Sequence, residues 1–314
     1  MVGDAIADRF LYGSIARVSR EAPVFILRHE QTETIPGGAA NCAMNLAALG
    51  ASVSLVSVAG DDEAGRELRH KLERAGVNCE GVITDSSLNT TTKVRILAGQ
   101  AHSTRQQVIR IDYEDPTFSD VDARHQLTLA LQKAASEAHA VIISDYNYGV
   151  VDEPAVSTLR DVCAKRKVPV LVDSRYRLAT FTGFTSATPN EDELEHLIGE
   201  RISDAIHLEN AAQELKDKLA YRALLITRGG QGMMLLEDGE APLHIKAVGA
   251  ESPVDVTGAG DTVIATFALS LSCDSSFSDA ARLANYAGGL VVMKRGTASV
   301  TAAELDHSIL NSEQ

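Results

Sequence analysis

A segment of small residues followed by a carboxylate, Asp-Val-Thr-Gly-Ala-Gly-Asp-Thr at 255–262, contains the residue types that phosphoryl transfer requires. Gly258, Ala259 and Gly260 open a predicted helix, where free backbone N–H groups and the positive end of the helix dipole can bind an anion. Asp261, in the first turn, is placed to orient an acceptor hydroxyl and to accept its proton. The helix N-terminus should depress the pKa of this carboxylate and make it a weak base. The pattern favours a sugar or alcohol kinase; the alternative is a glycine-rich turn whose aspartate only stabilises the helix dipole.

Composition and charge limit the partners of such a site. The 314-residue chain is 45% hydrophobic and has a formal net charge of -14. It can therefore bury a large core and should have no general affinity for nucleic acid or anionic membranes. Its four cysteines lack the close spacing of zinc sites or disulfide frameworks, and we find no signal peptide and no apolar run of membrane-spanning length. We expect a cytoplasmic protein with reduced thiols.

Apolar strands alternate with helices over most of the chain, and several strands end in polar residues. Such alternation predicts an α/β fold with a mostly parallel sheet, whose ligand crevice lies at the carboxyl ends of the strands. The first strand looks short, because only two residues precede Gly3. Side chains expected to face the crevice are Asp4, Asp8, Asp145, Asp173, Asn190 and Thr227.

Two segments interrupt this alternation and predict a small separate sheet, which we call the lid. Its strands should come from about residues 16–36 and 88–113. Lys93 and Arg95 lie at i and i+2, hence on one face of a strand, and Arg110 lies on the next strand. These cations favour an anionic substrate, with solvated charges on an edge strand as the alternative.

Chain organisation beyond the lid is simple. We find no internal repeat and no long linker, so residues 1–314 should form a single domain. The unpaired edges of the lid predict a homodimer formed through it. Glycine-rich turns at Gly37-Gly38 and in the Thr227 to Gly232 loop allow a ligand to approach the backbone closely, or equally allow tight packing and a hairpin. Small residues around Asn285 likewise allow either the close approach of a ligand or tight helix packing.

In this order, the motifs resemble those of the ribokinase-like, or PfkB, carbohydrate kinases along nearly the whole chain. The matching features are the Gly-Asp-x-x-x-Asp opening, Pro-Gly-Gly-Ala-Ala-Asn at 36–41, Asn190 with Glu193, the Thr227 to Gly232 loop and the 255–262 segment. The resemblance implies a ribokinase-like three-layer α/β/α sandwich with a mostly parallel central sheet and a small β-sheet lid.

The resemblance also implies a role for each motif. Asp261 would be the catalytic base, with the amides of Gly258, Ala259 and Gly260 as the anion hole. The substrate site would consist of Asp8, Gly37, Gly38, Asn41, Lys93, Arg95, Arg110, Asp145 and Arg175. The nucleotide site would consist of Asn190, Thr227, Gly229, Gly232, Thr257, Gly258, Gly260 and Asn285, with Asn190 and Glu193 organising the metal. The implied cofactors are ATP and Mg²⁺, and a monovalent cation is left open.

Within the family, the likeness is greatest to kinases that phosphorylate the anomeric hydroxyl of D-glycero-D-manno-heptose 7-phosphate, on the route to ADP-heptose and lipopolysaccharide. It rests on Asp8-Arg9-Phe10, on Thr92 to Arg95 and on Gln107 to Asp112. The chain departs from these kinases at Tyr148, where they usually have Lys, and at Ser174-Arg175, where they have Pro-Lys. Two alternatives stay open: a kinase for an unphosphorylated sugar or a nucleoside, and a non-catalytic nucleotide or sugar sensor. Because no nucleotidyltransferase segment follows, only kinase activity is expected.

Overall fold

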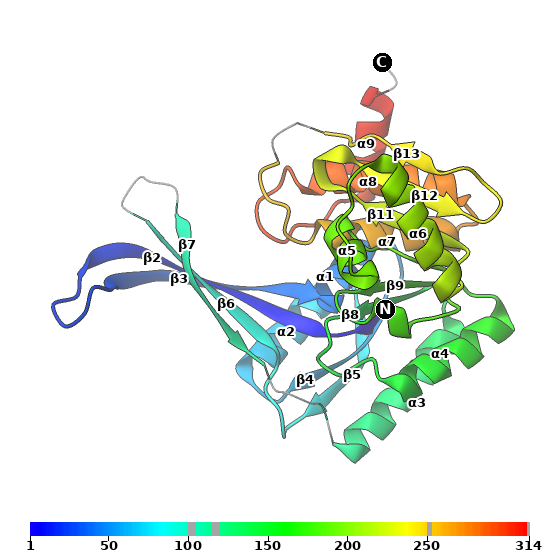
Figure 1. Cartoon of the computed structure of the whole chain (residues 1–314). Helices are drawn as coiled ribbons and strands as arrows, with labels where there is room; N and C mark the ends of the chain where they lie inside the picture. Colours follow the sequence, from blue (N-terminus) through cyan, green and yellow to red (C-terminus); the bar gives the residue numbers. More distant parts are fainter. Residues whose placement is uncertain (100–104, 115–117, 119, 250–252, 313–314) are drawn as a thin grey trace.

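A nine-stranded sheet forms the centre of the molecule (Figure 1). The computed structural model describes residues 1–99, 105–114, 118, 120–249 and 253–312. The strand order in the sheet is β13-β12-β11-β10-β9-β8-β1-β4-β5, and only the pairings of β12 are antiparallel. The strands are β1 (Val2–Gly3), β4 (Ser54–Gly60), β5 (Asn78–Asp85), β8 (Val141–Asp145), β9 (Val170–Ser174), β10 (Ser186–Ala187), β11 (Ala223–Thr227), β12 (Met233–Glu237) and β13 (Leu243–Ile245). The prediction of a mostly parallel sheet is confirmed.

Helices cover both faces of this sheet and give the predicted three layers. Each helix buries an apolar stripe against the sheet, and the two faces have separate cores. One face carries α3 (Val121–Glu137), α4 (Glu153–Arg166), α5 (Glu191–Ile198) and α6 (Ala205–Leu219). The other carries α1 (Ala39–Ala48), α2 (Glu63–Arg74), α7 (Ala259–Ser272) and α8 (Phe277–Val291), with α9 (Ala302–Ser312) against α8. Within the described ranges, every helix is too short or too polar to cross a lipid bilayer.

The lid is a four-stranded sheet that extends away from the body (Figure 1). Its strand order is β3-β2-β6-β7, built from β2 (Ala5–Val18), β3 (Phe25–Gly38), β6 (Thr92–Gly99) and β7 (Gln106–Tyr113). The lid is larger than the sequence predicted, because β2 begins at Ala5 rather than near residue 16. Ala5 pairs with Gly38, and the pairing of the two long strands continues to Val18 with Phe25, with register shifts after Tyr12 and after Ile15.

The base of the lid lies at the carboxyl end of β1. Gly3 of β1 has φ +152°, and a Cβ there would lie 2.0 Å from the Ser144 carbonyl oxygen, so only glycine fits beside β8. The chain then leaves the central sheet at Asp4 and enters the lid at Ala5. The first strand is short, as expected, and it brings the lid residue Asp8 next to the carboxyl ends of the strands of the central sheet.

Candidate active site

Asp261 lies in the first turn of α7 and is almost completely buried. Its side chain accepts a hydrogen bond from Asn41 Nδ2 at 2.7 Å and another from the Tyr146 hydroxyl. Burial raises the pKa of Asp261 to about 7, although both hydrogen bonds act to lower it. The expected depression by the helix N-terminus is therefore wrong, because the loss of solvation outweighs the dipole. A carboxylate with this pKa can accept a proton near neutral pH.

A chain of buried polar side chains fixes Asn41. Thr262 Oγ1 donates to Asn45 Oδ1 at 2.9 Å, and Asn45 Nδ2 donates to Asn41 Oδ1 at 3.3 Å. Asn41 and Asn45 are 2% and 0% exposed. The predicted sugar ligand Asn41 thus directs its amide nitrogen to Asp261. Sequence reasoning missed Asn45, whose signal was a second amide one helical turn after Asn41 on an otherwise apolar helix.

Glycines around Asp261 are required by close contacts. Gly258, the N-cap of α7, has φ +77°, and a Cβ there would lie 2.6 Å from Asn41 Nδ2. A side chain at Gly258 would therefore displace the amide that binds Asp261. The position of a Cβ on Gly260 has no atom within 4 Å, so there is open space beside this residue. The Ala259 amide instead donates to the Val256 carbonyl oxygen at 3.2 Å, which removes it from the predicted anion hole in this structure.

Asp8 lies where the lid joins the body. Its side chain is 6% exposed and forms an ion pair with Arg95 of β6. A Cβ on Gly37 would lie 2.4 Å from Asp8 Oδ2, and one on Gly38, which has φ +55°, would lie 2.6 Å from the Asp4 carbonyl oxygen. Because neither glycine has room for a Cβ, close packing against Asp8 and the neighbouring backbone explains the Gly37-Gly38 pair.

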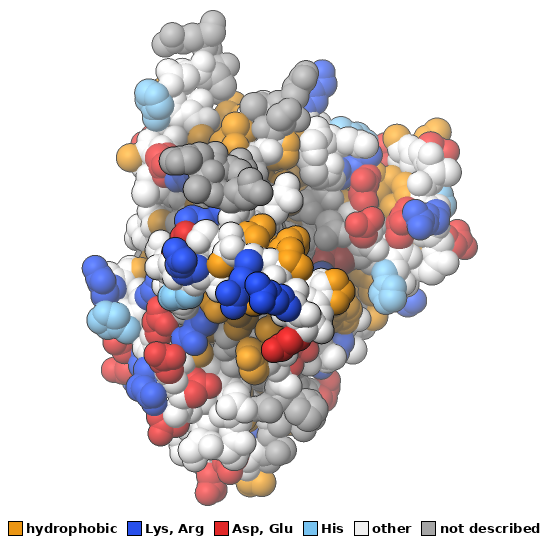
Figure 2. All heavy atoms as spheres, turned by 90° about the vertical axis from the view of Figure 1, so that its left-hand side faces the viewer, with side chains coloured by type: hydrophobic (Ala, Val, Ile, Leu, Met, Phe, Trp, Pro, Cys, Tyr) orange, Lys and Arg blue, Asp and Glu red, His pale blue; other side chains and the backbone are white. Residues whose placement is uncertain are grey.

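The structure brings the three predicted lid cations onto one part of the lid. Arg95 lies directly opposite Arg110 in the β6–β7 register, and Lys93 lies two residues before Arg95. The Lys93 ammonium is 5.8 Å from the ring centroid of Tyr146 and 5.6 Å from that of Tyr148. Desolvation lowers the pKa of Lys93. In Figure 2, which views the molecule from the lid side, basic side chains gather near the centre of a face on which acidic and basic groups are otherwise mixed.

The pairing of these cations differs from one to the next. Arg110 pairs with Asp112 of its own strand at 2.9 Å, and Arg95 pairs with the buried Asp8. Like charges directly opposite on neighbouring strands are unfavourable unless an anion lies between them. The arrangement of Arg95 and Arg110 therefore suits an anionic group bound under the lid.

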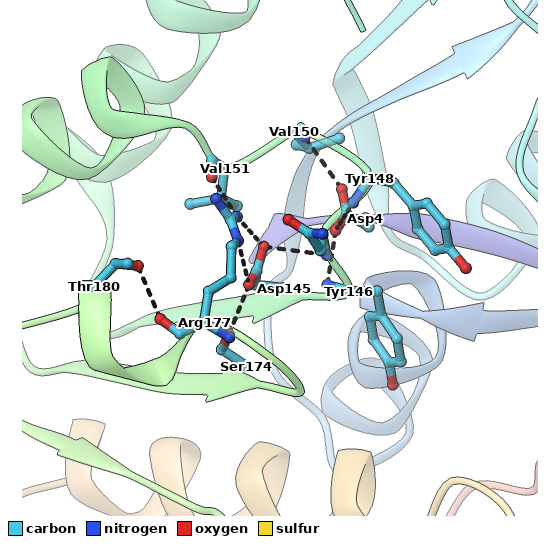
Figure 3. A network of polar contacts seen from close by, with 10 residues as sticks. Asp4, Asp145, Tyr146, Tyr148, Val150, Val151, Ser174, Arg177 and Thr180 are labelled. Carbon is cyan, nitrogen blue, oxygen red and sulfur yellow. Dashed lines mark hydrogen bonds and ion pairs between the residues drawn. The ribbon is translucent and has the colours of Figure 1, made fainter. Parts of the chain in front are cut away.

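Asp145 belongs to an internal network rather than to the open crevice (Figure 3). Its carboxylate accepts hydrogen bonds from Ser174 Oγ at 2.6 Å and Arg177 Nε at 3.2 Å, and pairs with Arg177 Nη2 as well. The side chain of Asp145 is 0% exposed. In this structure its oxygens hold the turn that carries Arg175, and the role of Asp145 as a substrate ligand stays a prediction. Sequence reasoning did not identify Arg177.

Asp4 is likewise structural. Its carboxylate accepts backbone N–H groups of Tyr146 at 2.7 Å, Tyr148 at 3.2 Å and Val150 at 3.2 Å (Figure 3). It is 1% exposed, so it does not face the crevice as expected. Asp4 instead fixes the loop after β8, and this loop carries the Tyr146 ring toward Asp261.

Asp173 lies near the end of β9, and Arg175 follows this strand. Burial, and after it the charge of Asp261, raises the pKa of Asp173 well above its usual range. The exposed Arg175 favours the ionised forms of both Asp173 and Glu193. Arg175 therefore lies among carboxyl groups near Asp261, where an anionic substrate could also reach it. Its predicted role as a substrate ligand stays a prediction.

Two of the predicted nucleotide residues come together at the ends of two strands. Asn190 forms an isolated parallel bridge with Thr227 at the end of β11. Gly229 has φ +52° with open space around it, whereas Gly232 has φ +90° and a Cβ there would lie 2.0 Å from the Ile245 carbonyl oxygen. Asn285 is buried and donates to the Lys246 carbonyl oxygen at 2.8 Å. Thr257 is exposed, and its amide donates to Asp255 Oδ1 at 3.0 Å.

The predicted metal residues form a helix cap. Asn190 Oδ1 accepts the Glu193 amide at 2.8 Å, and Glu193 Oε2 accepts the Asn190 amide at 3.0 Å, which is a capping box on α5. Among the residues that the structure describes, no group of three or more His, Cys, Asp or Glu side chains is arranged to hold a metal ion. Asn190 and Glu193 therefore suit Mg²⁺ only if phosphate groups and water supply most of its ligands.

Comparison with known proteins adds independent evidence. The model of the "pfkB family carbohydrate kinase" matches residues 2–303. The chain is 40% identical over 310 residues to "Bifunctional protein HldE" of Pseudomonas aeruginosa strain LESB58, and 42% identical over 309 residues to that of Coxiella burnetii strain Dugway 5J108-111. These alignments cover 98% of the chain but only 63% and 62% of the two relatives. The chain therefore spans a little less than two thirds of the relatives it matches.

Solved structures support the fold. Phosphofructokinase-2 from Escherichia coli, in complex with substrates and products, superposes with a TM-score of 0.80 at 18% identity, covering 100% of this chain and 99% of the other. Ribokinase from Arabidopsis thaliana, complexed with ribose and ATP, gives a TM-score of 0.75 at 22% identity, covering 98% and 97%. The predicted ribokinase-like fold is confirmed.

Proposed function

From the membership of this chain in the pfkB family of carbohydrate kinases, we propose that it transfers the γ-phosphoryl group of ATP to the anomeric hydroxyl of D-glycero-D-manno-heptose 7-phosphate. The product would be the 1,7-bisphosphate, an intermediate on the route to ADP-heptose and lipopolysaccharide. The observation that carries the choice of sugar is the 40% identity to "Bifunctional protein HldE" over 98% of the chain. This chain matches only part of the length of these relatives, so the proposal does not extend to the activity of the full-length proteins.

The lid cations give this substrate a physical rationale. A sugar that already carries a phosphate needs cationic partners, and charge-assisted hydrogen bonds to phosphate are stronger than neutral ones. Lys93 and Arg110 lie beside Arg95 on the lid, and Arg95 pairs with Asp8, whose charge acts on Asp261. When the sugar binds, its hydroxyls would compete with Arg95 for Asp8 and release the guanidinium for the phosphate.

Asp261 is the proposed catalytic base. With its pKa near 7, it orients the acceptor hydroxyl and takes its proton as the oxygen attacks the γ-phosphorus, while ADP leaves on the opposite side. Asn41 and Tyr146 hold the carboxylate in position. The amides of Gly258 and Gly260 would stabilise charge on the transferring group. Closure of the lid would exclude water, which otherwise hydrolyses ATP.

ATP would lie along the Asn190, Thr227 and Gly229 side of the crevice. Mg²⁺ would neutralise charge on the ATP phosphates, with Glu193 as the nearby carboxylate. Since Glu193 also caps α5, a matched pair of variants separates the two roles: Glu193→Gln keeps both halves of the capping box, and Glu193→Ala removes the half in which the side chain accepts the Asn190 amide. A monovalent cation stays an open prediction, tested by comparing turnover in potassium and sodium buffers.

A homodimer formed through the lid is also part of the proposal. The outer strand β7 exposes a row of apolar side chains, with Val108 at 47%, Ile109 at 50% and Tyr113 at 55% exposure. An exposed apolar edge strand is a surface that pairs readily with another chain. We expect the mass measured by light scattering to be that of a dimer, and a monomeric mass at micromolar concentration would refute this point. A cytoplasmic location likewise remains a proposal.

The acceptor specificity tests the proposal. Purified protein with Mg-ATP is assayed for ADP release with D-glycero-D-manno-heptose 7-phosphate, fructose 6-phosphate, ribose, fructose and adenosine. We expect the heptose phosphate to give the highest kcat/KM. A preference for another acceptor would keep the sugar kinase and reject the heptose assignment, and the departures at Tyr148 and Ser174-Arg175 would then be its first explanation. Absence of turnover with every acceptor, despite ATP binding, would favour the sensor.

A further inference from the structure

A cavity of about 560 Å³ opens at the end of the sheet opposite Asp261. It lies where β9, β10 and β11 begin, and is lined by the last turn of α4 and by the turn between α7 and α8. Its volume is within the range of pockets that hold metabolites. None of the residues singled out for catalysis or for sugar and nucleotide binding lines it, so the cavity needs a separate explanation.

Three cations line this cavity, although the chain as a whole is strongly acidic. They are Arg160 of α4, Lys167 at its C-cap and Arg222 just before β11, accompanied by one carboxylate, Asp274. Within the described part of the chain, none of the three forms an ion pair with a carboxylate. A positive cavity in a chain with a formal net charge of -14 selects for anions.

Aromatic rings hold two of these guanidinium groups in place. The Arg160 guanidinium carbon lies 5.6 Å from the ring centroid of Phe184, and that of Arg222 lies 5.4 Å from the ring centroid of Phe277. Both rings are buried, so they form a firm apolar wall. A stacked guanidinium keeps its edge N–H groups available. In the part of the chain that the structure describes, Arg160 donates a hydrogen bond to the Thr182 carbonyl oxygen at 3.1 Å, and the Arg222 guanidinium donates none.

Neutralisation of helix ends explains part of this charge but not all of it. The helices α4, α6 and α7 end at this side of the sheet, where cations are favourable near their negative dipole ends. Arg222 is different, because it stacks on Phe277, the first residue of the 15-residue helix α8. Its charge adds to the positive end of that dipole, and the carboxylates near it are Asp279 in the first turn of α8 and Glu237, which interacts electrostatically with Arg222.

We propose that the cavity at the amino ends of the strands binds a metabolite-sized organic anion, whose phosphate or carboxylate group contacts Arg160 and Arg222 and whose body packs on the apolar wall. The occupant binds without competing with sugar or ATP, since the crevice lies at the other ends of the same strands. The proposal does not depend on which sugar the crevice accepts.

The test is calorimetric titration of the full chain with citrate, pyrophosphate and AMP, while the crevice is kept saturated with ADP. We expect at least one of these anions to bind with a dissociation constant below about 1 mM, and the double variant Arg160→Gln/Arg222→Gln to weaken that binding at least tenfold. Binding of citrate alone would identify a carboxylate ligand, and binding of pyrophosphate or AMP a phosphate. The control is Arg201→Gln/Arg282→Gln, which changes two exposed arginines outside the cavity and should bind like the wild type.

A second variant covers the case in which the arginine variant fails to fold. Ala164→Phe fills the cavity from an exposed position on α4 without changing any charge, and should abolish binding. Failure of all three anions to bind the wild type, or equal binding by wild type and variants, would overturn the proposal. Kinase turnover is not a readout here, so failure of this proposal is distinguishable from failure of the proposed function.

Discussion

The two ends of the central sheet present opposite chemistry. At the carboxyl ends, Asp145, Asp173 and Asp261 lie close together, and burial raises the pKa of the last two. At the amino ends, Arg160 and Arg222 lie on aromatic rings around a cavity. Both ends belong to the same parallel strands, so strand direction alone does not decide which ligand chemistry each end provides.

What differs is how each end compensates its charges. A buried carboxylate is unfavourable unless it accepts hydrogen bonds, and at the carboxyl ends the donors come from neighbouring loops, as with Arg177 and Ser174 on Asp145. The amino-end cations keep their charge partly in contact with solvent and need no such donors. Substitutions at the carboxyl ends should therefore affect both catalysis and stability, whereas those at the amino ends should affect mainly ligand binding.

The largest effect is expected for Asp261→Asn. Loss of the proposed base should lower kcat about a thousandfold, within the range typical of general-base removal, with little change in the KM for ATP. Steady-state kinetics with the heptose phosphate measure this. Asp161→Asn, an exposed carboxylate on α4, is the matched control and should behave like the wild type. A variant at Asp261 that retains wild-type turnover would contradict the assignment.

The same variant should change how stability depends on pH. The pKa of Asp261 is about 7 in the folded state and 3.8 in the reference state, so the folded protein holds this proton more tightly. The resulting stabilisation is fully present below pH 4 and is lost as the pH rises to about 7. Urea unfolding should therefore show Asp261→Asn gaining stability relative to the wild type over this window. A difference that does not vary with pH would refute the raised pKa.

Arg177→Ala tests the network around Asp145. Removing one partner leaves a completely buried carboxylate unpaired and should lower the free energy of unfolding by about 3 kcal/mol. Urea denaturation measures the loss, and Arg201→Ala, at an exposed arginine, is the control. In the double variant with Asp145→Asn, the loss should be smaller than the sum of the single losses. Additive losses would mean that the pair is not coupled.

How much of the structure could be predicted depends on how far apart in the sequence the interacting residues lie. The alternation of strands and helices followed from local periodicity, and α5 and β11 belong to that alternation. The helix Val121–Glu137 was missed, because its apolar positions are diluted by polar and small residues. The start of β2 was also missed, since pairing of Ala5 with Gly38 joins residues far apart in the chain.

The candidate site shows the same limit. Motifs identified Asp261 and Asn41, but not that Asn41 would bind Asp261 across 220 positions. The pKa of Asp261 was misjudged because the helix dipole is visible in the sequence, whereas burial is a property of the packed fold. Asp145 and Asp4 were assigned to the crevice by their place at strand ends, and only tertiary contacts show that both are occupied internally.

Neutralising the lid cations should have an intermediate effect. The double variant Lys93→Gln/Arg110→Gln should raise the KM for the heptose phosphate about 10- to 100-fold, because two charge-assisted contacts to phosphate are lost. The KM for ATP should not change. Arg17→Gln, at an exposed arginine of β2, is the control. If neither KM changes, the lid cations are solvated charges and the acceptor is unphosphorylated.

The smallest effect is expected for Tyr146→Phe. The Tyr146 hydroxyl lowers the pKa of Asp261, so its removal should move the ascending limb of the pH profile of kcat to higher pH by less than about one unit. Turnover at pH 7 should fall a few-fold and recover above pH 8. Tyr148→Phe is the matched control, since that hydroxyl binds Glu114 instead. An unshifted profile, or an equal shift in both variants, would remove Tyr146 from this role.

The central claim is that the carboxyl ends of the sheet perform phosphoryl transfer to the anomeric oxygen of a phosphorylated heptose. Phosphorus NMR of a reaction containing wild-type protein, Mg-ATP and D-glycero-D-manno-heptose 7-phosphate tests it directly. We predict a new sugar phosphate signal, coupled to the anomeric proton, which grows in a one-to-one ratio with ADP while the signal of the 7-phosphate is retained. Formation of ADP and inorganic phosphate alone, or a phosphate on any other hydroxyl, would contradict the account.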